Sequence, residues 1–174
     1  VVIMAWNTSW QPKLYRLLDT DNRIDIGKGI YKSSFAVAIL AAIAMLYSKE
    51  IVMLLAGKSY IEGIAIVPVI IIGNALIHVY LCYVNFTFYM KKTLLISLAT
   101  VSAMLINIAL NYYLIPSYGI AGAAWATVVA YATLALFHYF IATVILKKNT
   151  VSIALLIGFL LLLLSVYSVS YTHL

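Results

Sequence analysis

Long apolar stretches follow one another along nearly the whole chain, and they limit its fold more than any other feature. Several approach or exceed the roughly 18 residues that indicate a transmembrane helix, because about 20 residues cross a bilayer. The sequence of 174 residues is 66% hydrophobic and only 9% charged, with a mean hydropathy of +1.08. Soluble domains have an apolar share of about 45–50%. We therefore expect an all-α, polytopic membrane protein with one transmembrane domain over residues 1–174.

The apolar stretches predict six transmembrane helices separated by short polar loops. The expected helices cover about residues 1–18, 33–56, 64–90, 94–115, 120–146 and 151–169. The sequence begins inside an apolar stretch, so we expect a fragment of a longer protein. Cys82 is the only cysteine, which excludes disulfides within the chain and cysteine-based metal sites. We predict neither a metal nor a cofactor.

The positive charges indicate a topology. The formal net charge is +6, and the Lys and Arg residues form short clusters between the apolar stretches. If the loops alternate across the membrane, only Lys49 and Lys58 fall on one side. The other side carries Lys13, Arg16, Arg23, Lys28, Lys32, Lys91, Lys92, Lys147 and Lys148. Positive loops face the cytoplasm, which places loops 19–32, 91–93 and 147–150 there and indicates a multi-pass protein of the cell membrane. Topology explains the basic charge better than a nucleic-acid partner does.

Polar residues recur at helical spacing within three successive apolar stretches. Near 100° per residue, each set shares one face: Asn74, His78 and Asn85; Thr100, Asn107 and Asn111; Thr127, Tyr131 and His138. Such residues face the interior of a bundle, where they line a cavity or form interhelical hydrogen bonds contributing about 0.6–2 kcal/mol. Both interpretations stay open, and His138 also fits a position near the cytoplasmic interface. The cavity candidates are Asn74, His78, Asn85, Thr100, Asn107, Asn111, Thr127 and Tyr131.

Residues 106–127 read INIALNYYLIPSYGIAGAAWAT and predict a close-packed helical hairpin. Pro116 is expected to end the first helix, and Gly119 permits a tight turn. Gly122, Ala126 and Ala130 are four residues apart, so they present a smooth face that lets the second helix approach its neighbour. The paired amides of Asn107 and Asn111 would hydrogen-bond or hydrate the end of the first helix.

This stretch resembles the polysaccharide-exporting branch of the multidrug/oligosaccharidyl-lipid/polysaccharide flippase superfamily, which carries a pattern like N-x-x-x-N-x-x-L-I-P-x-Y-G-I-x-G-A-A-x-A-T. The matching residues are Asn107, Asn111, Leu114, Ile115, Pro116, Tyr118, Gly119, Ile120, Gly122, Ala123, Ala124, Ala126 and Thr127. Looser matches lie at Ala5-Trp6, at Trp10-Gln11-Pro12 and in the segment IVMLLAGKSY, residues 51–60.

The resemblance implies most of the second six-helix repeat of a transporter that works by alternating access. The implied activity is the flipping or export of lipid-linked oligosaccharides for polysaccharide synthesis. Its partners would be the lipid-linked glycan, membrane lipids and polysaccharide assembly proteins. Lys13, Arg16, Lys91 and Lys92 would attract the anionic head group at the cytoplasmic rim, although they also suit topology anchors.

Three other functions compete with this one. A multidrug exporter of the same superfamily would share the architecture, and a structural membrane fragment would share the small-residue packing. A membrane glycosyltransferase or polymerase would need a metal site, for which Asp19-Thr20-Asp21 with Asp25 nearby is the best candidate. Arg23 and Lys28 favour a solvated loop of mixed charge instead, so we do not expect an enzyme.

Overall fold

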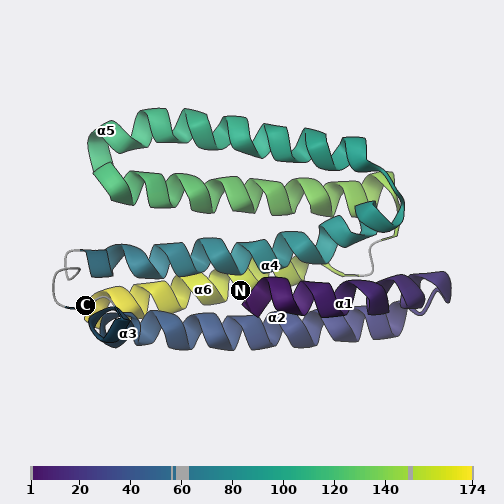
Figure 1. The fold of residues 1–174 in the computed structure, drawn as a ribbon, viewed down its shortest axis with the longest axis horizontal. Helices are drawn as coiled ribbons and strands as arrows, with labels where there is room; N and C mark the ends of the chain where they lie inside the picture. Colours follow the sequence, from purple (N-terminus) through teal and green to yellow (C-terminus); the bar gives the residue numbers. More distant parts are fainter. Residues whose placement is uncertain (1, 56, 58–62, 149–150, 174) are drawn as a thin grey trace.

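A computed structural model describes residues 2–55, 57, 63–148 and 151–173, and these residues are almost entirely helical (Figure 1). The elements are α1 (Val2–Asp19), α2 (Arg23–Leu46), α3 (Ser48–Leu55), α4 (Val67–Tyr89), α5 (Thr93–Phe140), the π-helix η2 (Ile141–Ile145) and α6 (Ile153–His173). The described residues include no strand, so the all-α prediction is confirmed.

Four stretches of the described chain are long and apolar enough to cross a membrane: Arg23–Leu46, Gly63–Tyr89, Thr93–Ile145 and Ile153–Ser170. The third is long enough for two crossings because α5 doubles back at Gly119, where φ is 56° and ψ is −136°. Its first leg, residues 93–118, and its second leg, residues 120–140, correspond to two of the expected helices. The helix expected at 1–18 forms as α1, but it is too polar to count among these four stretches.

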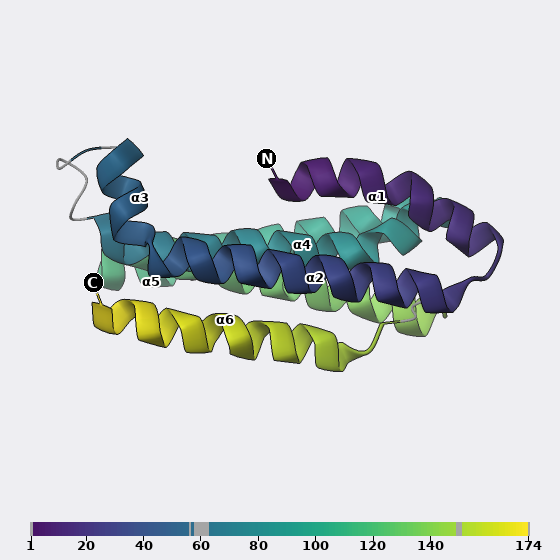
Figure 2. The same ribbon diagram turned by 90° about the horizontal axis from the view of Figure 1, so that it is seen from below.

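Several predicted boundaries were wrong. The helix expected at 33–56 begins ten residues earlier, at Arg23, and is interrupted at Tyr47, after which α3 turns away from the bundle (Figure 2). The polar loop expected at 19–32 is therefore only a short turn. Pro116 does not end the first leg of α5, which continues to the bend at Gly119. The last helix begins at Ile153 and extends to His173, beyond the expected end at residue 169.

Helix α4 is the central element of the bundle. It packs against the second leg of α5 on one side and against the layer formed by α1, α2 and α6 on the other (Figures 1 and 2). Burial follows from this position, since α4 contributes more of the large, fully enclosed side chains than any other element, Tyr83, Phe86, Ile72 and Leu76 among them. Pro68 lies in the first turn of α4, where its missing N–H has no intrahelical acceptor to lose.

Three connections lie at one end of the bundle: α1 to α2, α4 to α5, and η2 to α6 (Figure 1). Each contains one residue in the left-handed region, Asp21, Lys91 or Lys147, with φ between 47° and 55°. At Lys91 the turn is closed by hydrogen bonds from its own N–H to the Phe88 carbonyl and from Lys92 N–H to the Thr87 carbonyl. The bend at Gly119 and helix α3 lie at the opposite end.

Candidate functional site

A polar groove lies between the two legs of α5. Its volume is about 230 Å³, and its lining residues are Thr100, Ala103, Met104, Asn107, Thr127, Ala130, Tyr131 and Leu134. The structure thus brings together four predicted cavity residues, two from each leg. We call this the hairpin groove.

The hydrogen bonds of the hairpin groove determine what it offers to a ligand. The hydroxyls of Thr100 and Thr127 donate to carbonyls of their own helix, Ile96 O at 2.9 Å and Ala123 O at 3.0 Å. Their oxygen lone pairs are left as acceptors. Asn111 Nδ2 donates to Asn107 Oδ1 at 3.0 Å, which orients the Asn107 amide and leaves its Nδ2 as a donor. The groove therefore offers both acceptors and a donor, and all its lining residues are uncharged.

A second groove, of about 190 Å³, lies on the other side of the same leg, against α4. Thr127 and Tyr131 line this groove as well as the first, and Asn74 joins them from α4. The two helices pack together here: a Cβ on Gly73 would lie 3.7 Å from Val128 Cγ2, an ordinary van der Waals contact. Five of the eight predicted cavity residues therefore gather around the second leg of α5. A sixth, Asn111, is connected to this group by its hydrogen bond to Asn107.

The predicted stripe on α4 is divided between two environments. Asn74 is exposed, and its Nδ2 donates to the Ile70 carbonyl at 2.9 Å. His78 is fully buried among α1, α2 and α6: its Nε2 lies 3.1 Å from Ser34 Oγ, and its ring centroid lies 4.4 Å from that of Trp6. Asn85 is also buried, and its Nδ2 donates to Asn7 Oδ1 at 2.8 Å. His78 and Asn85 line neither of the two grooves.

Sequence reasoning missed Asn7 and Ser34, the partners of these two buried residues. A signal was available for Asn7, because Asn7, Gln11 and Tyr15 follow one another at four-residue spacing, and Gln11 Nε2 donates to Tyr15 Oη at 2.7 Å. Ser34 gave no such signal. It lies at the wall of a cavity of about 400 Å³ between α2 and α6, whose lining is otherwise mostly apolar.

His138 shares a helix face with Thr127 and Tyr131 in the sequence, but it does not line their grooves. It is fully buried against α4, with its ring centroid 5.9 Å from that of Tyr80. The π-helix η2 begins three residues later.

The four rim candidates Lys13, Arg16, Lys91 and Lys92 are exposed at the end of the bundle that carries the three connections. Lys13 Nζ lies 5.9 Å from the ring centroid of Trp10. Tyr89 donates its hydroxyl to Asp19 Oδ1 at 2.7 Å, which joins the ends of α1 and α4. The structure therefore places the basic ends of α1, α4 and η2 together, as the alternation of loops requires.

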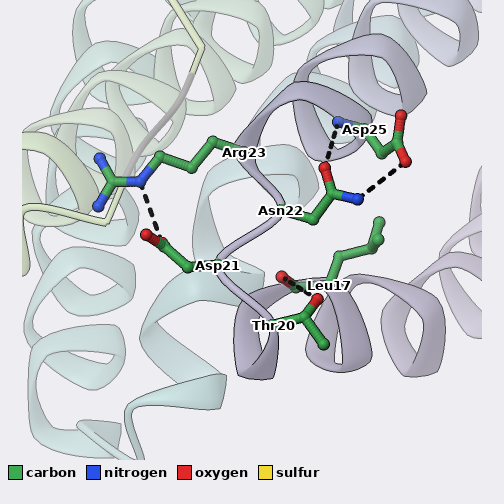
Figure 3. Close-up of polar contacts among 6 residues, drawn as sticks. All are labelled: Leu17, Thr20, Asp21, Asn22, Arg23 and Asp25. Atoms are coloured by element: carbon green, nitrogen blue, oxygen red, sulfur yellow. Dashed lines mark hydrogen bonds and ion pairs between the residues drawn. The ribbon is translucent and has the colours of Figure 1, made fainter.

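Both carboxylates of the Asp19-Thr20-Asp21 segment have a partner, and Figure 3 shows that of Asp21. Asp21 pairs with Arg23 Nε at 3.0 Å, while Asp19 accepts the hydroxyl of Tyr89. Asn22 caps α2: its Oδ1 accepts the backbone N–H of Asp25 at 3.2 Å, and its Nδ2 donates to Asp25 Oδ2 at 2.9 Å. In the described part of the chain, no three His, Cys, Asp or Glu residues are grouped so that they could hold a metal ion. The segment acts as a helix-capping turn.

In comparisons with known proteins, no family model, no curated protein and no solved structure matches this chain. The resemblance of residues 106–127 to the flippase superfamily therefore rests on those residues themselves. Two residues of this stretch, Asn107 and Thr127, line the hairpin groove from opposite legs.

Proposed function

We propose that this chain is part of a membrane transporter that moves lipid-linked oligosaccharides across the cell membrane by alternating access. The observation that carries the proposal is the gathering of Asn74, Thr100, Asn107, Thr127 and Tyr131 around one apolar leg of α5. Polar side chains at membrane depth are costly when they face lipid, and they usually mark a substrate path or a contact between helices.

The chemistry of the hairpin groove suits sugar hydroxyls. A hydroxyl group both donates and accepts, so it pairs well with the free lone pairs of Thr100 and Thr127 and with the amide of Asn107. The lining residues of both grooves are uncharged, which favours a neutral polyhydroxylated ligand over a cationic drug. The negative charge of the substrate's pyrophosphate would instead be bound at the rim, by the ammonium groups of Lys91 and Lys92.

The depth of the groove also supports this function. Thr100 and Asn107 follow Lys92 by 8 and 15 residues. At a rise of about 1.5 Å per residue, they lie roughly 12 and 22 Å from the basic end of a hydrocarbon core about 30 Å thick. A glycan passing between the leaflets must cross this middle zone, so the groove lies where a transport path needs polar groups.

The proposal can be tested with the export of a lipid-linked glycan in cells that make the protein. The test variant combines Asn107→Leu, Thr127→Val and Tyr131→Phe, which remove polar groups while nearly keeping side-chain size. Loss of three hydrogen bonds of about 0.5–1.5 kcal/mol each predicts a decrease in export of about 10-fold or more.

The matched control replaces three exposed aliphatic residues of α5, with Val101→Ile, Ile108→Leu and Val129→Ile. These changes leave both grooves intact, so export is expected to stay within about 2-fold of wild type, since surface substitutions change stability little. Unchanged export in the groove variant, at wild-type protein level, would contradict the proposal.

A further inference from the structure

The exposed aromatic residues of α5 are confined to the region of the bend and to the end of the second leg. Tyr112, Tyr113 and Tyr118 are 76%, 71% and 67% exposed near the bend, and Phe137 and Phe140 are exposed near the end of the second leg. The large exposed hydrophobic residues of the first leg between Lys92 and Tyr112 are all non-aromatic, and they comprise Leu94, Leu98, Val101, Met104, Leu105 and Ile108. Tyrosine concentrates where a membrane protein passes from hydrocarbon to head groups, because its ring is apolar and its hydroxyl is polar.

The spacing along the first leg matches the thickness of a bilayer. Tyr112 follows Lys92 by 20 residues. A helix of that length rises about 30 Å, which equals the hydrocarbon core of a typical bilayer. With Lys91 and Lys92 at one interface, Tyr112 and Tyr113 therefore reach the other, and Tyr118 lies beyond it near the bend.

Helix α3 provides independent support from another part of the chain. Helix α2 runs 24 residues from Arg23 to Leu46, a rise of about 36 Å, and the exposed Tyr47 follows its last residue. There the chain leaves the bundle axis, and α3 turns across it at the same end as the bend of α5 (Figure 2). Leu54 and Leu55 of α3 are 85% and 80% exposed, while Glu50 adds a polar group to the same short helix. A short amphipathic helix that turns across the bundle is typical of the membrane interface.

We propose that Tyr47, Tyr112, Tyr113, Tyr118 and helix α3 form a membrane anchor in the lipid head-group layer of the leaflet opposite the basic loops. The tyrosine hydroxyls lie among the head groups, and Leu54 and Leu55 insert into the outer part of the acyl layer. This anchor sets the depth of the α5 hairpin, and thereby holds Thr100 and Asn107 near the middle of the bilayer. The inference concerns how the protein lies in the membrane, and it holds for any substrate.

The test measures depth with nitroxide labels on the full chain in phosphatidylcholine and phosphatidylglycerol vesicles. Single cysteines are introduced as Tyr112→Cys or Val101→Cys in a Cys82→Ala background, and oxygen is compared with a water-soluble nickel chelate as relaxing agent. Eleven residues separate the two positions. The label at position 112 is therefore expected near the phosphate level, and the label at 101 about 16 Å deeper. Equal depths, or a label at position 112 in bulk water, would overturn the proposal.

Two further measurements test the same proposal. Tyr112→Trp should show strong fluorescence quenching by lipids brominated near the head group and weak quenching by lipids brominated near the chain end. The combination Tyr112→Ser and Tyr113→Ser should shift the Val101 label by a few ångströms in depth, whereas Tyr112→Trp with Tyr113→Trp should not. An unchanged depth in the serine variant would also count against the anchor. These measurements contain no substrate, so they fail or succeed independently of the transport proposal.

Discussion

Gly122 on the second leg of α5 lies directly against the backbone of Leu114 on the first leg: a Cβ built on Gly122 would be 2.5 Å from the Leu114 carbonyl oxygen. The obstacle is backbone, which cannot rotate away as a side chain can. The two legs therefore meet as closely as a glycine allows, immediately after the bend at Gly119.

Replacement of Gly122 by alanine is expected to destabilise the hairpin by about 1–3 kcal/mol, because the added methyl group forces the legs apart. The free energy of unfolding in detergent micelles measures this effect. Gly158→Ala in α6 is the matched control, since a Cβ at Gly158 meets nothing within 4 Å. The control should be neutral or slightly stabilising, because alanine favours a helix by up to about 1 kcal/mol over glycine. Equal stabilities of the two variants would contradict the close approach.

The buried amide pair of Asn7 and Asn85 is expected to contribute to the docking of α1 on α4. Asn85 Nδ2 donates to Asn7 Oδ1 at 2.8 Å, and Asn85 is 1% exposed. Asn85→Ala should lower the free energy of unfolding by about 0.6–2 kcal/mol, the range of interhelical hydrogen bonds in membranes. A double-mutant cycle with Asn7→Ala isolates the pair, since the second substitution should cost little once the partner is absent.

Asn74→Ala serves as the control for that cycle, because the Asn74 side chain is exposed and donates only to Ile70 of its own helix. It should change stability by less than about 0.5 kcal/mol. Strict additivity of Asn7→Ala and Asn85→Ala would show that the two amides do not interact.

The thiol of Cys82 is expected to resist alkylation in the folded protein. It is 1% exposed and lies 3.5 Å from His78 Nε2, in a site closed by α1, α2 and α6. Maleimide labelling should be slow in a mild detergent and complete after denaturation in dodecyl sulfate. Trp6→Ala removes a ring that packs on His78, so it should accelerate labelling of the native protein. Rapid labelling of the wild-type protein would mean that α1, α2 and α6 do not keep the Cys82 site closed.

The amino-acid sequence was sufficient to predict the helical class and the α5 hairpin, because apolar stretches and small-residue spacing act locally. The turn predicted at Gly119 is confirmed, whereas the helix end predicted at Pro116 was wrong. Pro116 lies inside the first leg, which continues past it, and the chain bends only at Gly119, because a glycine can adopt φ 56° and ψ −136° without strain. The break at Tyr47 is followed by the polar residues Ser48, Lys49 and Glu50, a local signal that the single helix expected at 33–56 did not take into account.

The candidate site was predictable only in part. Helical periodicity correctly placed Thr100 with Asn107 and Thr127 with Tyr131, and these pairs line one groove. Helical periodicity could not predict that Asn74 lies in a different environment from His78 and Asn85. The three residues share one face of α4, but different helices cover that face along its length. The partners Asn7 and Ser34 come from α1 and α2, and such contacts between distant segments depend on tertiary packing.

The sidedness of the bundle can be tested with single cysteines at its two ends. Lys91 lies in the turn between α4 and α5, while the exposed Glu50 lies in α3 at the opposite end. Positive residues concentrate on the cytoplasmic side, and the basic ends of α1, α4 and η2 lie together. In a Cys82→Ala background, Lys91→Cys should therefore react with a membrane-impermeant maleimide only after the cells are permeabilised, whereas Glu50→Cys should react in intact cells. Reversed labelling would place the basic loops outside the cell, and equal labelling of both positions in intact cells would show that α2 and α4 do not separate them across a membrane.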